Sequence, residues 1–105
     1  MTATLIAQQT VDVDAEGFLT DVTQWSEDVA AEIADQNGIP ELTTSHWQVV
    51  NFMRTRYLDT GSSPSIRALG KESGVSVKEL YELFPKRPAK LAAKIAGIPK
   101  PRGCI

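Results

Sequence analysis

The strongest constraint on the fold is a series of helix start and stop signals that runs from about residue 26 almost to the end of the sequence. Ser26 can cap a helix whose apolar residues recur with a period of about 3.6, and Asn37-Gly38 ends it. Thr43 begins a longer helix that Gly61 ends. These signals predict a mainly helical chain.

The helix after Thr43 carries its apolar residues at three- and four-residue spacing, which predicts one stripe facing a core. The stripe is Trp47, Val50, Met53 and Tyr57. His46, the only histidine, lies in the first turn. Since no second histidine, cysteine or acid stands at ligand spacing, we expect a capping or surface histidine and no metal site.

Two short helices follow, separated by Gly74, and Ser76 caps the second of them. Their spacing is that of a helix-turn-helix, which also occurs as a purely structural corner. The second helix, "VKELYELF", has one lysine and two glutamates, whereas contacts to DNA phosphates need net positive charge. We therefore favour a scaffold, and Lys71 and Lys78 keep DNA binding as an alternative.

The last helix, "KRPAKLAAKIAG", begins near Pro88 and ends at Gly97. Beyond it, Pro99 and Pro101 exclude regular helix and favour an extended segment. We predict a flexible C-terminal arm over residues 98–105. The seven residues from Gly97 to the only cysteine would span about 20–25 Å when extended.

The N-terminal region has the character of a short β-hairpin. Val11 and Val13 alternate with acids, a polar break occurs at Gln8-Gln9, and "DAEGF" is a turn signal. We predict a mainly α fold with a small N-terminal hairpin at about residues 4–19 and helices between about 26 and 97. Residues 1–97 would form one domain, which suits a chain of 105 residues.

No apolar run approaches the roughly 18 residues that a membrane span needs, so no membrane association is expected. The N-terminus has neither the basic region nor the apolar stretch of a secretory signal, so we expect a cytoplasmic protein. In a reducing compartment a single cysteine stays a thiol.

Charge is divided unevenly along the chain. Up to residue 85 there are five basic and 13 acidic side chains, a formal charge of −8, and from residue 86 there are six basic and no acidic ones. The six are Lys86, Arg87, Lys90, Lys94, Lys100 and Arg102. Such segregation predicts that the C-terminal segment meets an anionic partner, although a solvated basic helix with a frayed tail fits the charges equally well.

Cys104 has no base or acid beside it in the sequence. Lys100 and Arg102 favour the thiolate and the terminal carboxylate opposes it, so we expect a pKa near the usual value of about 8.5. A thiol without local catalytic machinery suits a non-enzymatic carrier of sulfur or acyl groups better than an enzyme. An unused cysteine in a disordered tail is the alternative, which the proline-containing spacer makes less attractive.

Several stretches together resemble the TusE/DsrC family of sulfur-trafficking proteins. They are "LTTSHWQVVNFMR", "SPSIRALGK", "LYELFPKRPAK" and above all "KIAGIPKPRGCI". The resemblance implies a small helical domain with an N-terminal hairpin and a C-terminal arm, and it assigns the functional cysteine to Cys104. In TusE-like members this cysteine receives a persulfide from a TusBCD-type or DsrEFH-like donor and passes it to a tRNA 2-thiouridylase.

In DsrC-like members a second cysteine lies eleven positions earlier, where this chain has Ala93. The single cysteine therefore resembles TusE, and it favours a relay such as tRNA 2-thiouridine synthesis. A DsrC-like role, with a sulfur-oxidation enzyme as acceptor, is the alternative. We expect Lys94, Lys100 and Arg102 to dock the arm or to stabilise the anionic persulfide, and we expect no cofactor.

Overall fold

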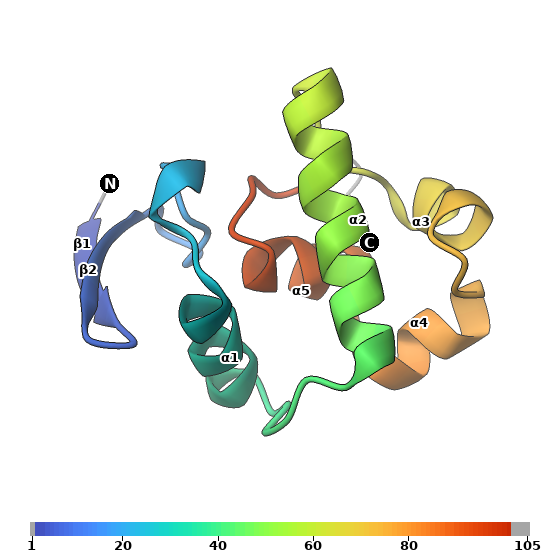
Figure 1. The fold of residues 1–105 in the computed structure, drawn as a ribbon, viewed down its shortest axis with the longest axis horizontal. Coiled ribbons are helices and arrows are strands. Elements are labelled where there is room, and N and C mark those ends of the chain that lie inside the picture. Colours follow the sequence, from blue (N-terminus) through green and yellow to red (C-terminus); the bar gives the residue numbers. More distant parts are fainter. Residues whose placement is uncertain (1, 102–105) are drawn as a thin grey trace.

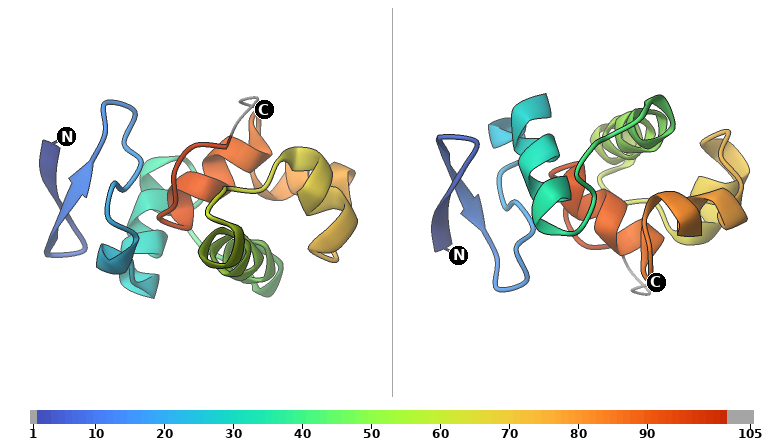
Figure 2. Two further views of the ribbon diagram at one scale, coloured as in Figure 1. Left: turned by 90° about the horizontal axis from the view of Figure 1, so that it is seen from above. Right: turned by 90° about the horizontal axis from the view of Figure 1, so that it is seen from below.

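The computed structural model describes residues 2–101, which form five α-helices, one 3-10 helix and one two-stranded antiparallel sheet (Figure 1). The elements are β1 (Thr2–Ile6), β2 (Gln9–Val13), η1 (Val22–Gln24), α1 (Glu27–Gln36), α2 (Thr44–Thr60), α3 (Ile66–Glu72), α4 (Val77–Leu83) and α5 (Pro88–Ile95). The predicted fold class is confirmed. The hairpin lies at one end of the molecule, and α3 and α4 lie at the other (Figure 2). Within the described range, no helix is long and apolar enough to cross a membrane.

The hairpin is shorter than the predicted 4–19 region. Strands β1 and β2 pair with Ile6 opposite Gln9, and the connection is Ala7–Gln8, with φ angles of 54° and 64°. A two-residue turn with both φ angles positive fits the twist of a hairpin, although glycine and asparagine are its usual residues. The turn lies one residue before the predicted polar break at Gln8-Gln9. The "DAEGF" stretch forms a second turn, in which Asp14 Oδ1 accepts from the backbone N–H groups of Glu16 and Phe18.

Helix α5 is the centre of the helical part, where it packs against α1, α2, α3 and α4. Its inward positions are mostly small, so neighbouring helices can approach closely. Ala89, Ala92, Ala93, Ile95 and the following Ala96 are all buried. Large side chains from the other elements surround α5 and are fully buried: Phe18, Leu19, Met53, Leu69, Leu80 and Phe84. Each such side chain contributes about 1.5–3 kcal/mol to folding, so a central helix of this kind holds the domain together.

The predicted helix caps at Ser26, Thr43 and Ser76 are confirmed. His46 completes the cap of α2, because its Nδ1 accepts from the Thr43 N–H at 3.0 Å. Its Nε2 lies 2.9 Å from the Leu83 carbonyl oxygen, which can only accept, so the ring is the Nε2–H tautomer. The capping prediction for His46 is therefore correct, and the same ring also ties α2 to the end of α4.

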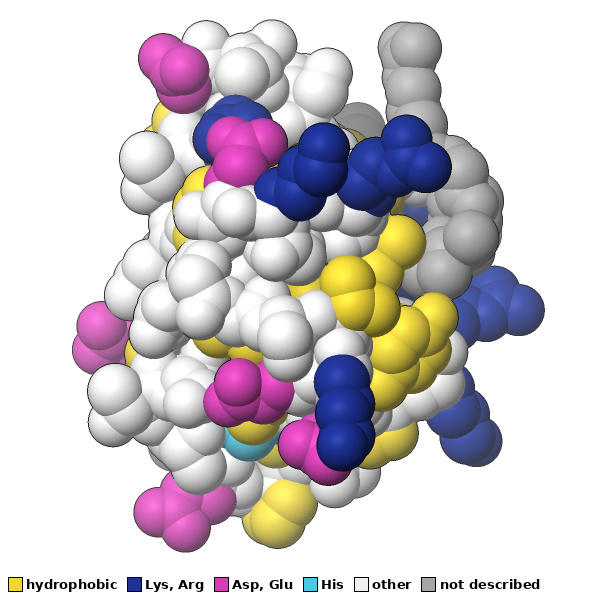
Figure 3. Space-filling view, turned by 90° about the vertical axis from the view of Figure 1, so that its right-hand side faces the viewer, with side chains coloured by type: hydrophobic (Ala, Val, Ile, Leu, Met, Phe, Trp, Pro, Cys, Tyr) yellow, Lys and Arg dark blue, Asp and Glu magenta, His cyan; other side chains and the backbone are white. Residues whose placement is uncertain are grey.

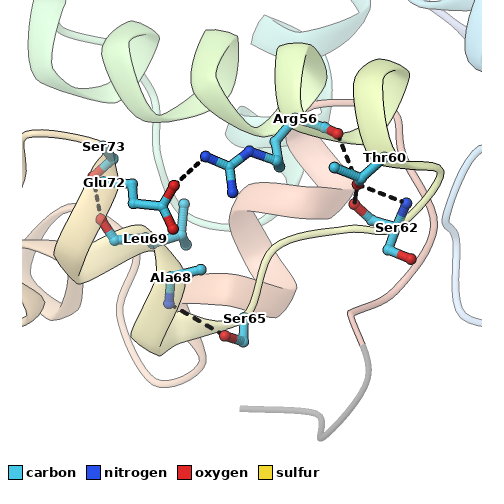
Figure 4. Close-up of polar contacts among 8 residues, drawn as sticks. All are labelled: Arg56, Thr60, Ser62, Ser65, Ala68, Leu69, Glu72 and Ser73. Atoms are coloured by element: carbon cyan, nitrogen blue, oxygen red, sulfur yellow. Dashed lines mark hydrogen bonds and ion pairs between the residues drawn. The ribbon is translucent and has the colours of Figure 1, made fainter.

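Helices α3 and α4 form the predicted helix-turn-helix-like pair. Gly74, with a φ angle of 85°, makes the turn between them, and Gly70 allows Val77 to approach α3 closely. Arg56 on α2 forms a salt bridge to Glu72 on α3 (Figure 4). Figure 3 faces this end of the molecule and shows apolar side chains at the surface between charged ones. The exposed apolar side chains on α4 are Val77 and Tyr81, each 43% exposed.

Gly97, just after α5, should tolerate substitution poorly. Its φ angle is 69°, and a Cβ atom placed there would lie 2.5 Å from Trp25 Cδ1. We expect Gly97→Ala to lower the free energy of unfolding by about 2–4 kcal/mol, because it adds backbone strain and an overlap with a packed ring. Gly38→Ala is the matched control: its φ angle is 89° but nothing lies within 4 Å of the added Cβ. It should cost only about 1 kcal/mol in the same urea titration. Equal losses in the two variants would contradict the role assigned to Trp25.

Candidate functional site

The segment that leads toward Cys104 begins with a tight reversal at the end of α5. The Gly97 N–H donates to the Lys94 carbonyl at 3.2 Å, and the Ile98 N–H donates to the Ala93 carbonyl at 3.1 Å. This is the hydrogen-bond pattern of a helix that ends on a glycine with positive φ. Ile98 and Pro101 are buried. Ile98 and Pro101, which were predicted to belong to a flexible arm, thus pack against the helical body, whereas Pro99 between them is exposed.

Two side chains hold this reversal in place. Trp25 Nε1 donates to the Ile95 carbonyl at 2.8 Å, and Arg54 Nη1 donates to the Ala96 carbonyl at 2.8 Å. The Arg54 guanidinium also donates to the Val22 carbonyl at 3.2 Å and lies 4.2 Å from the centroid of the Trp25 ring. Burial lowers the pKa of Arg54 from its ordinary value. These contacts satisfy carbonyls at the end of α5 that the helix itself leaves open.

Farther along, the segment passes between α2 and the turn that follows β2. Ser63 Oγ donates to the Pro99 carbonyl. Lys100 Nζ lies 3.1 Å from one carboxylate oxygen of Glu16, and Lys90 Nζ lies 3.1 Å from the other. Hydrogen bonds from Lys100 and then Lys90 hold the pKa of the Glu16 carboxyl below its ordinary value. Glu16 therefore links the packed segment to α5.

Beside this carboxylate lies a hollow of about 390 Å³ with a strongly basic wall. Its lining residues are Asn37, Pro85, Lys86, Arg87, Lys90, Leu91 and Lys94. Lys94 Nζ lies 5.2 Å from the centroid of the Phe18 ring, a cation–π contact. A second hollow, of about 540 Å³, lies on the hairpin side of Lys94 and includes Asp14, Gln36 and Asn37 in its lining. Lys94 thus borders both hollows.

The residues predicted to serve the thiol are placed as follows. Lys94 lies on α5, one turn after Lys90, which was not among the predicted site residues, and Lys100 is joined to Lys90 through Glu16. Arg102 and Cys104 lie outside the described residues. The sequence reasoning did not identify Glu16, Trp25, Arg54 or Ser63. No local signal could have revealed Glu16, because it contacts a lysine 84 positions away.

Ala93, the position to which the resemblance assigns a second cysteine in DsrC-like members, is fully buried on α5. Its carbonyl accepts from the Ile98 N–H. The side chain at this position therefore belongs to the core, directly under the reversal that begins the arm.

The family model described as "DsrC like protein" matches residues 5–105. This chain belongs to the DsrC-like family. Among its relatives, the sulfurtransferase TusE of Salmonella typhimurium is 50% identical over 103 residues, which are 90% of this chain and 93% of that protein. The sulfurtransferase TusE of Pectobacterium atrosepticum is 50% identical over 105 residues, 92% of this chain and 94% of that protein. The resemblance to the TusE/DsrC family is confirmed.

Solved structures of the DsrC-like family superimpose over nearly the whole chain. The crystal structure of dissimilatory sulfite reductase I (DsrI) has a TM-score of 0.88 and 35% identity, covering 99% of this chain and 100% of that one. The NMR structure of DsrC from Allochromatium vinosum has a TM-score of 0.81 and 38% identity, covering 98% and 97%. The overall fold is therefore shared with these structures over nearly the whole chain.

Arg54 should be essential for the structure at the end of α5. A lysine, which keeps the positive charge, should not replace it. We expect Arg54→Lys to lower the free energy of unfolding by about 1.5–3 kcal/mol, because an ammonium cannot serve two carbonyls and stack on Trp25 at once. The measurement is urea denaturation followed by circular dichroism. Arg56→Lys is the control: it can keep the exposed salt bridge to Glu72 and should leave the midpoint nearly unchanged. Equal shifts in the two variants would contradict the anchoring role.

Glu16 should titrate at a pH below the ordinary glutamate value of 4.5. Because the folded-state pKa is lowered, the contribution of its contacts is complete above 4.5 and is lost as the pH falls through the lowered value. NMR titration of the Glu16 carboxyl carbon should show its pKa rising in Lys100→Gln, and rising less in Lys90→Gln. Lys71→Gln, a change on α3, should leave it in place. A wild-type pKa at or above 4.5 would contradict the bridge.

Proposed function

We propose that this protein is a sulfur carrier in which Cys104 accepts a sulfur atom as a persulfide and transfers it to a partner protein. The observation that carries the proposal is the 50% identity to sulfurtransferases named TusE over 90% of the chain. The family match also extends through residue 105 and so includes Cys104. Homologues named TusE and DsrC both support the general role of sulfur carrier.

The chemistry requires only exchange between sulfur atoms. The Cys104 thiolate attacks the outer sulfur of a donor persulfide, so that a new bond forms to Cys104 Sγ while the donor's S–S bond breaks. The donor cysteine leaves as a thiolate. Delivery is the same step with an acceptor thiolate attacking the outer sulfur on Cys104, which then leaves as the thiolate. Neither step needs an added oxidant or reductant.

The described part of the molecule supports a carrier more than an enzyme. His46, the only histidine, is buried and uses both ring nitrogens in contacts with Thr43 and Leu83. It is therefore committed to the helix cap and does not act as the base for a thiol. Lys94 and Lys100 keep their proposed role of docking the arm or stabilising the anionic persulfide, together with Arg102.

Within this role we favour a relay such as tRNA 2-thiouridine synthesis in the cytoplasm. The proposed upstream partner is a TusBCD/DsrEFH-like donor, and the proposed downstream partner is a tRNA 2-thiouridylase. Ala93 supports this choice over a DsrC-like part in sulfur oxidation, because a chain with one cysteine cannot form an internal disulfide.

DNA binding by α3 and α4 is less well supported. The outer face of α4 combines the exposed apolar side chains Val77 and Tyr81 with Lys78 and Glu82. Such a face offers few donors to phosphates. Salt-dependent binding to duplex DNA that is lost in the Lys71→Ala/Lys78→Ala variant would restore this alternative.

The carrier proposal predicts that the protein gains the mass of one sulfur atom when it is incubated with a persulfide-bearing sulfurtransferase. The gain should appear in intact-mass spectra of the wild type, disappear on reduction, and be absent from Cys104→Ser. The Lys71→Gln variant, altered far along the chain from the thiol, should load like the wild type. If Cys104→Ser gains the same mass, the carrier proposal fails.

The tRNA pathway predicts a separate result in cells. In Salmonella typhimurium lacking its own TusE, this protein should restore 2-thiouridine in tRNA, measured by chromatography of digested nucleosides. Cys104→Ser should not restore it. A protein that loads sulfur in vitro but leaves the tRNA unmodified would be a carrier in another relay.

A further inference from the structure

The packing of residues 98–101 limits how far the thiol can travel from the folded body. Cys104 comes three residues after Pro101, and Pro101 is buried. Three residues span at most about 10–11 Å, even when fully extended. A partner's sulfur can therefore meet Cys104, as the proposed function requires, only if the partner lies against the surface around Pro101 and Lys100.

The basic hollow described above lies beside that surface. Glu16 pairs with both Lys100 and Lys90, and Lys90 lines the hollow. The side chain of Lys100, the residue before Pro101, therefore lies beside the wall of the hollow. We define the basic rim as Lys86, Arg87, Lys90 and Lys94, all of which line this hollow. Any protein that receives sulfur from the short tether is expected to come close to the basic rim.

The rim carries more positive charge than the surrounding described residues neutralise. Glu16 pairs with Lys90, whereas Lys86, Arg87 and Lys94 form no salt bridge to any residue from 2 to 101. Lys86 is also held at a positive φ angle of 76°, and Pro85 and Pro88 restrict the chain on either side. Two apolar residues, the exposed Pro85 and the half-buried Leu91, also line the hollow. Constrained cations around a partly apolar hollow are suited to an ordered protein contact.

We propose that the basic rim docks a carboxylate-rich protein surface that surrounds the reactive cysteine of a sulfur donor or acceptor. An acidic protein patch fits better than a nucleic acid because the rest of the described chain carries net negative charge. Asp35, two residues before Asn37 of the hollow, is exposed, and residues 1–85 carry a formal charge of −8. A long polyanion crossing the rim would continue over acidic surface, whereas a patch of a few carboxylates would not.

The test uses two synthetic acceptor peptides, each with one cysteine flanked either by glutamates or by glutamines. Wild-type protein loaded with sulfur by inorganic polysulfide is mixed with each peptide, and the transfer rate is followed by mass spectrometry. The decisive variant is Lys86→Gln/Arg87→Gln, which leaves Lys94 and the Glu16 bridge intact. Arg67→Gln/Lys78→Gln, on α3 and α4, removes the same charge from the other end of the molecule.

The ratio of wild-type to variant rates is compared between the two peptides, so that differences in the peptide thiol itself cancel. For the glutamate peptide we expect the rim variant to be about 5-fold slower than the wild type at low salt, and for the glutamine peptide about equal to it. The control variant should resemble the wild type with both peptides. The effect should shrink to less than about 2-fold at 0.5 M NaCl, because salt screens exposed charges.

Three results would overturn the docking proposal. The first is an equal loss of transfer rate with both peptides in the rim variant, and the second is an equal loss of rate in the control variant. The third is that polyuridylate binds more tightly than the glutamate peptide and that this binding depends on Lys86 and Arg87. If the wild type does not load sulfur at all, the proposed function fails instead. Docking is then measured directly, as binding of the glutamate peptide with its cysteine replaced by serine, with the same variants and the same expected order.

Discussion

The arrangement of the whole C-terminal part depends on how the carbonyl groups at the end of α5 are satisfied. A helix leaves its last carbonyls without internal partners, and here two of them lie where water has little access. Trp25 and Arg54 supply the missing donors, and the Arg54 guanidinium stacks on the Trp25 ring. Because the indole occupies the space beside Gly97, the chain can turn there only without a side chain. The direction in which residues 98–101 leave the helix follows from this one cluster.

The direction of residues 98–101 limits which part of the molecular surface Cys104 can reach. Ile98 is buried directly after the reversal, and Ser63 and Glu16 contact the next residues of the segment. Burial of one isoleucine contributes about 1.5–3 kcal/mol, more than an exposed salt bridge typically does. Packing therefore fixes the base of the arm, while the Glu16 bridge gives it a salt- and pH-sensitive contact. A carrier built in this way depends on docking of its body, because its tether is short.

Local features of this fold could be predicted from sequence, and long-range contacts could not. Ser26, Thr43 and Gly97 act within a few residues of their own position, so their types and spacing already indicate where helices begin and end. The polar break at Gln8-Gln9 placed the hairpin turn within one residue of its position at Ala7–Gln8, although residues of these types seldom adopt positive φ angles. Glu16 meets Lys100, and Ser63 meets Pro99, only after the chain has folded. The resemblance predicted the family, which is confirmed, whereas the burial of Ile98 and Pro101 could be seen only in the structure.

The basic residues close to Cys104 in the sequence affect both the stability and the reactivity of the proposed persulfide. Nearby cations stabilise an anionic persulfide, which makes the outer sulfur less ready to accept an attacking thiolate. On our docking proposal, a partner covers the basic rim with carboxylates and cancels part of this effect when its own cysteine arrives. Carboxylates beside the persulfide favour its protonated form, which is the better electrophile. The uncompensated positive charge would thus keep the sulfur unreactive in the free carrier, and its neutralisation on docking would favour transfer in the complex.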